Sequence, residues 1–88
     1  MNEKFFFISE DVKWKEINES IIIDPDYALN STAAFVFKRI TDGLSNLQIA
    51  DALSMEFDAD ISVITADLED LLQDMQEEKI IKEATLRN

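Results

Sequence analysis

The sequence predicts an α+β domain in which a three-stranded antiparallel sheet is followed by three helices. The first third of the chain contains short runs of β-branched and aromatic residues separated by polar ones, a pattern typical of strands. From residue 30 to 81, apolar residues recur at helical spacing in three blocks with capping residues between them. Eighty-eight residues suffice for one domain with one modest core. We therefore expect a single domain over residues 1–88, with strands within about 5–29 and helices within about 31–79.

Three segments are predicted to form the sheet as a meander. Residues 5–8 are a short apolar run, and residues 12–17 alternate near a period of two, which is typical of a half-buried strand. We expect the single tryptophan of that second strand, Trp14, to lie in the core. Ile21-Ile22-Ile23 is the third strand, and Asp24-Pro25-Asp26 interrupts it because proline fixes its own φ and lacks an N–H donor.

The first two helices are delimited by capping residues. Asn30 or Ser31 caps the first helix, and Asp42-Gly43 ends it because glycine tolerates the left-handed conformation of a helix terminus. The second helix opens with a capping box, in which the Ser45 side chain accepts from the Gln48 amide and Gln48 reaches back.

The third helix is predicted to be the longest, from about Asp60 to about Lys79. It carries one continuous apolar stripe, formed by Ile61, Ile64, Leu68, Leu71, Leu72 and Met75. Ile80-Ile81 forms either a short strand or a packed tail.

The composition argues against catalysis and against a cofactor. The chain has no cysteine and no histidine, which removes thiolate nucleophiles, imidazole bases and most metal ligands. Residues 58–62 begin like a calcium loop, but Val63 stands where that loop requires glycine. We read this segment as a helix start whose acids are favoured by the dipole, and we expect no catalytic residue, no metal and no cofactor.

The charge of −11 argues against nucleic-acid and membrane partners. Three helices with a small sheet suggest a winged helix, in which the third helix would enter DNA. Here that helix is strongly acidic, so its carboxylates would approach phosphates. No apolar run approaches the roughly 20 residues that span a bilayer, and no signal sequence is evident. We expect a cytoplasmic protein.

Two binding roles remain open from the residues alone. Ser45, at a helix start in an acidic protein, loosely matches the serine of an acyl carrier protein that bears a phosphopantetheine arm, although Leu44 and Asn46 flank it where that family has aspartate and leucine. Alternatively, if Ile21-Ile22-Ile23 is an outer strand, its free backbone groups can pair with an extended peptide. A purely structural or regulatory acidic module is a third possibility.

Several segments follow one another in a distinctive order and spacing: Leu29-Asn30-Ser31-Thr32-Ala33, Asp42-Gly43, Ile49-Ala50 with Leu53 and Phe57, and Ile64-Thr65-Ala66-Asp67-Leu68 with Leu71-Leu72 and Met75. From about Val12 to about Ile81, this arrangement resembles the PqqD-like family, the leader-peptide recognition proteins of ribosomally made, post-translationally modified peptides. The resemblance implies a winged-helix-like fold. It also implies a non-catalytic adaptor that binds the leader of a precursor peptide and presents it to a modifying enzyme, such as a radical enzyme, a protease or a cyclase.

The resemblance further implies where the leader binds: as an added strand beside the third strand, in a cleft walled by the third helix. The peptide-binding residues expected on this basis are Ser20, Ile21, Ile22, Ile23, Asp24, Tyr27, Ile64, Asp67, Leu68, Leu71 and Met75. Glu78-Lys79 departs from the family, which often has glycine just before the terminal apolar pair. If acids line the cleft, the leader should carry Lys or Arg. Exchange of N-terminal strands between two copies would give a homodimer.

Overall fold

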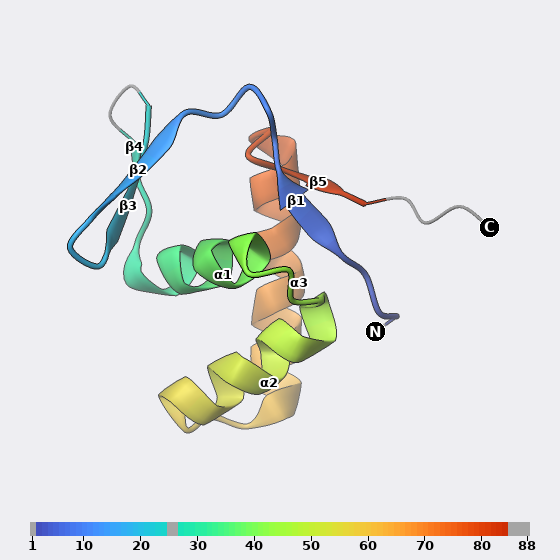
Figure 1. Ribbon diagram of the computed structural model, residues 1–88. Helices are drawn as coiled ribbons and strands as arrows, with labels where there is room; N and C mark the ends of the chain where they lie inside the picture. The colour runs from blue at the N-terminus through green and yellow to red at the C-terminus, as the bar shows by residue number, and fades with distance from the viewer. Residues whose placement is uncertain (1, 25–26, 85–88) are drawn as a thin grey trace.

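Three helices form the larger part of the regular secondary structure (Figure 1). The computed structural model describes residues 2–24 and 27–84, so Pro25 and Asp26 of the predicted turn lie outside the described residues. The helices are α1 (Ser31–Thr41), α2 (Asn46–Phe57) and α3 (Ile61–Glu77). Within the described ranges, none of them has the length and apolar character needed to cross a membrane.

The strands form two separate antiparallel sheets. One has three strands in the order β2 (Trp14–Ile17), β3 (Ser20–Ile23), β4 (Tyr27–Ala28). The other pairs β1 (Phe6–Ile8) with β5 (Ile81–Glu83), and Figure 1 shows this pair crossing beside α3, away from the larger sheet.

The predicted fold class is confirmed, but the predicted membership of the sheet is wrong. Residues 5–8 do not join the meander, and β4 takes the third place instead. The reason is long-range burial: by pairing with β5, the first strand brings Phe6 and Ile81 into the core, where both are almost fully buried. Of the two possibilities for Ile80-Ile81, a short strand or a packed tail, the structure has the strand: β5 begins at Ile81.

Local capping fixes where the helices begin and end. The side chain of Asn30 accepts from the Ala33 amide at the start of α1, and Gly43 follows that helix with a φ of +87°. The capping box of Ser45 and Gln48 is present at α2. These caps match the predictions because each depends only on residues close in sequence.

The core lies between the inner face of the larger sheet and the three helices. Ile21 and Ile23 of β3 are buried against it together with Phe37 of α1. The prediction that Trp14 lies in the core is wrong, since its side chain is 41% exposed. Its ring packs edge-on against Phe37 with centroids 4.8 Å apart. Because β2 is an outer strand, Trp14 covers the margin of the core and faces water on its other side.

Candidate peptide-binding groove

In the three-stranded sheet, β3 is the middle strand, so the outer edges belong to β2 and β4. Strand β3 pairs with β2 from Ser20 to Ile23 on one side and with β4 through Ile22 and Ile23 on the other. Of the two possibilities for Ile21-Ile22-Ile23, an outer strand that pairs with a peptide or a strand of the core, the outer strand is therefore excluded. Residues 27–29 run antiparallel to β3 and cover its edge opposite β2, so β4 is the outer strand.

The backbone of β4 presents one residue to the outside. The Leu29 N–H donates to the Ile21 carbonyl at 3.0 Å, and Tyr27 lies opposite Ile23. Backbone groups alternate in direction along an antiparallel strand. The N–H and C=O of Ala28, between these two residues, therefore point away from β3. By the same alternation, the Ile22 amide points toward β2.

Two pockets lie along α3 and share one lining residue, Leu71; one of them is next to β4. The first, about 140 Å³, is mainly apolar and is lined by Thr32, Leu53, Phe57, Ile64, Asp67, Leu68 and Leu71. The second, about 200 Å³, lies beside β4 and is lined by Tyr27, Leu29, Asn30, Ala33, Leu71, Asp74, Met75, Glu78 and Ile80. We call the two together the α3 groove.

The α3 groove is acidic at one end and apolar at the other. Asp74 and Glu78 line the pocket beside β4, whereas Asp67 is the single acid in the apolar pocket. No lysine or arginine is among the described residues that line either pocket. Such a groove supplies hydrocarbon surface, main-chain hydrogen bonds and negative charge, which are the components of peptide recognition.

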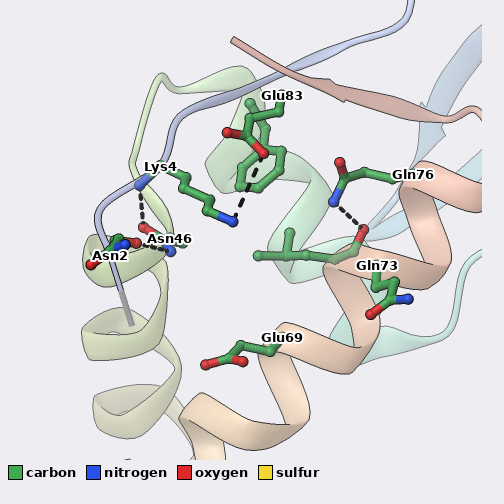
Figure 2. A pocket seen from close by; sticks show the side chains of 9 residues that line it. Asn2, Lys4, Asn46, Glu69, Gln73, Gln76 and Glu83 are labelled. Atoms are coloured by element: carbon green, nitrogen blue, oxygen red, sulfur yellow. Dashed lines mark hydrogen bonds and ion pairs between the residues drawn. The ribbon is translucent and has the colours of Figure 1, made fainter. Parts of the chain in front are cut away.

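A larger pocket, about 370 Å³, lies on the other side of α3 and is mainly polar (Figure 2). Asn46 lines this pocket and is hydrogen-bonded to the N-terminal segment. Its side-chain oxygen accepts from the Lys4 N–H at 2.7 Å, and its side-chain nitrogen donates to the Asn2 carbonyl at 2.8 Å. The Lys4 ammonium also lies 3.9 Å from a carboxylate oxygen of Glu83. Several polar groups here are already paired with one another, so this pocket anchors the N-terminal segment and is the weaker candidate for a ligand site.

The family model described as coenzyme PQQ synthesis protein D (PqqD) matches residues 19–81, which include β3, β4 and all three helices. The chain belongs to the PqqD family. A comparison with curated protein sequences found no match. A solved structure described as TbiB1 in complex with the TbiA(beta) leader peptide matches with a TM-score of 0.81, over 91% of this chain and 99% of that chain, at 18% identity. At that identity, the likeness shows a shared fold.

In this PqqD-family chain, the residues expected on the helix wall come together. Tyr27 lines the α3 groove. So do all five residues predicted on the helix wall: Ile64, Asp67, Leu68, Leu71 and Met75. The third-strand residues behave differently. Ile21 and Ile23 are buried in the core, Ile22 is half-buried, and Ser20 and Asp24 are exposed at the two ends of β3.

Sequence reasoning missed several groove residues. Asp74 and Glu78 continue the spacing of three to four residues that leads from Asp67 through Leu71, so the helical period could have identified them. Leu53 and Phe57 of α2 gave no such signal, because only the packing of α2 against α3 brings them to the groove.

Ser45 is placed where a prosthetic arm cannot attach. Its side chain is fully buried. The hydroxyl donates to a carboxylate oxygen of Glu3 at 2.9 Å and accepts from the Gln48 amide at 3.3 Å. This serine therefore acts as a helix cap, and the geometry gives no support to an acyl carrier. Among the described residues, no group of acidic side chains is arranged to hold a metal ion.

Proposed function

We propose that this PqqD-family chain is a non-catalytic adaptor that binds the leader segment of a ribosomally made precursor peptide. The observation that carries the proposal is the outer edge of β4 beside the α3 groove, which pairs with no further strand among residues 2–24 and 27–84. The family membership and the fold shared with TbiB1, which was solved with a leader peptide, support it. The leader would extend the three-stranded sheet by one strand and rest its side chains in the groove.

The backbone of Ala28 would provide the hydrogen bonds of this added strand. Its N–H and C=O point outward, so they are available to an extended peptide without breaking the pairing of β3 with β4. Side chains at every second position of the peptide would then face the groove. Tyr27, Ile64, Leu68, Leu71 and Met75 would contact them, whereas Ile21 and Ile23 would act from beneath by holding β4 in place.

A titration of labelled peptides tests this function. The probes are the N-terminal segments of the short proteins encoded next to this one, each labelled with fluorescein and followed by anisotropy. We expect saturable binding for the segment that precedes the modified core, and none for the core alone. Absence of saturable binding to every such segment would overturn the proposal.

The adaptor would then present the bound precursor to a separate modifying enzyme, such as a radical enzyme, a protease or a cyclase, in the cytoplasm where the precursor is made. Co-elution of adaptor, precursor and that enzyme in gel filtration tests this step. The same experiment reports a homodimer formed by exchange of β1, since an exchanged β1 would pair with the partner's β5 as it pairs here within one chain.

A further inference from the structure

We propose that the α3 groove selects peptides in which a large apolar side chain and a lysine or arginine lie about four residues apart. This inference rests on the proposed leader-binding function and adds the chemistry of the sequence that is recognised. The selectivity follows from the difference between the apolar end and the acidic end of the groove. The spacing follows from the length of α3 between these two ends.

The apolar end accepts a hydrocarbon side chain. Leu53 and Phe57 of α2 face Ile64, Leu68 and Leu71 of α3 across a pocket of about 140 Å³. Leu53 and Leu68 are almost fully buried, so they form a preformed floor, whereas Phe57 is 47% exposed at the margin. Covering this hydrocarbon with an apolar side chain removes it from water, which favours binding.

The end beside β4 favours a cation. Asp74 lies in the last turn of α3, and Glu78 is the C-cap of that helix, four residues later. Both line the same pocket, and neither forms an ion pair within the described residues. Tyr27, Leu29 and Leu71 line this pocket as well, so the aliphatic stem of a lysine or arginine has hydrocarbon to cover while its charge reaches the carboxylates. An acidic or apolar peptide residue at this position would leave both carboxylates unpaired.

The spacing follows from helix and strand geometry. Along α3, the rise from the middle of residues 64–68 to the middle of residues 74–78 is about 15 Å. An extended peptide covers this distance in about four to five residues. Because only every second side chain of a strand faces the groove, the even spacing of about four residues fits.

Selection from a random peptide library tests this inference without knowledge of the natural leader. Displayed peptides of about twelve residues, roughly twice the length that the groove holds, are selected on the wild type and on two double variants. Asp74→Asn with Glu78→Gln removes the groove acids. Asp70→Asn with Glu77→Gln removes two acids of the same helix that line neither groove pocket, so the change in net charge is matched.

We expect the wild type and the Asp70/Glu77 variant to enrich an apolar residue with a lysine or arginine about four positions away. The Asp74/Glu78 variant should keep the apolar enrichment and lose the basic one. For the best peptide, anisotropy should show binding that is about threefold to tenfold weaker to the Asp74/Glu78 variant, the range expected for partly exposed charge pairs.

Two other outcomes have distinct meanings. Apolar enrichment without a basic partner, or an equal response of the two double variants, would overturn the proposed selectivity and leave peptide binding intact. Failure to enrich any sequence on the wild type would count against the leader-binding function itself, and the selectivity would be rejected with it.

Discussion

Pockets lie on both sides of α3, but they differ in whether their polar groups are already hydrogen-bonded within the protein. The pocket around Asn46 is the larger one, and its side chains bond to the N-terminal segment. The α3 groove is divided into two smaller pockets and is more apolar at one end, and its other end is lined by Tyr27 and Leu29, the neighbours of Ala28 on either side.

This difference shows that volume alone does not identify a binding site. Hydrogen bonds within the first pocket stabilise the fold, and a ligand entering there would have to replace them. A peptide entering the α3 groove would cover hydrocarbon and pair with free backbone groups, so it gains contacts without breaking any. Variants on the two sides should therefore separate peptide binding from stability.

The largest expected effect on binding comes from Ala28→Pro. Proline removes the outward N–H of β4 and leaves a leader carbonyl without its donor, which costs about 2 kcal/mol, or roughly thirtyfold in Kd. Outer strands tolerate proline at such positions, so the pairing of β3 with β4 should persist. Anisotropy titration with the labelled leader segment measures the change, and circular dichroism checks the helices.

A proline on the opposite edge is the control for this variant. Glu16 lies on β2, the other outer strand, and its N–H points away from β3 because that of Lys15 points toward it. Glu16→Pro should leave leader affinity unchanged. Because this variant also loses the 2.8 Å ion pair between Glu16 and Lys38, Glu16→Ala is measured beside it to show the effect of that loss alone. Equal loss of affinity for both prolines would contradict pairing at β4.

Leu71→Ala should weaken leader binding by about tenfold, because Leu71 lines both pockets of the groove and about 1.5 kcal/mol of apolar contact is lost. Leu47→Ala on α2 is the matched control. Leu47 is 37% exposed and lines neither groove pocket. The Kd of the Leu71→Ala variant, measured by the same titration, should be about tenfold higher than that of the Leu47→Ala variant. Equal Kd values would exclude the groove as the leader-binding site.

Asn46→Ala should lower the free energy of unfolding by about 1 kcal/mol and leave leader affinity unchanged. The Lys4 amide loses its acceptor, and because the N-terminal segment can turn to water, the loss stays modest. Gln73→Ala, in the same pocket but without a side-chain hydrogen bond within the described residues, should change stability by less than about 0.5 kcal/mol. Urea denaturation measures the free energy of unfolding of both variants. A loss of leader affinity in Asn46→Ala would contradict the assignment of stability to one side of α3 and of peptide binding to the other.

The smallest effect concerns Asp60, which caps α3 below the apolar end of the groove. Hydrogen bonds from the Ser62 side chain and backbone lower the pKa of its carboxyl from the ordinary value of 3.8. A lowered pKa stabilises the fold above the ordinary value, and this contribution is lost as the pH falls through the lowered pKa. The Tm difference between wild type and Asp60→Asn should therefore shrink below pH 3.8. Asp51→Asn is the control, and a Tm difference independent of pH would contradict the cap.

The sequence predicted the helix wall of the groove better than its sheet edge, for a physical reason. Ile64, Leu68, Leu71 and Met75 follow a period that is set within one helix, so their shared face could be predicted from spacing. Which strand is outermost depends on pairing between distant segments. Nothing local to residues 5–8 indicates that they pair with β5. Counting them as the first strand of one sheet makes Ile21-Ile22-Ile23 the third strand, whereas β4 is the third strand of the observed sheet.

Amide hydrogen exchange at Ala28, measured by NMR with and without the leader segment, tests the central claim most directly. Ala28 N–H should exchange rapidly in the free protein and become protected when the leader binds, while Ile22 N–H, already directed at β2, stays protected throughout. Leader binding that leaves Ala28 exchange unchanged and instead protects the outward amides of β2, at Trp14 and Glu16, would contradict the account.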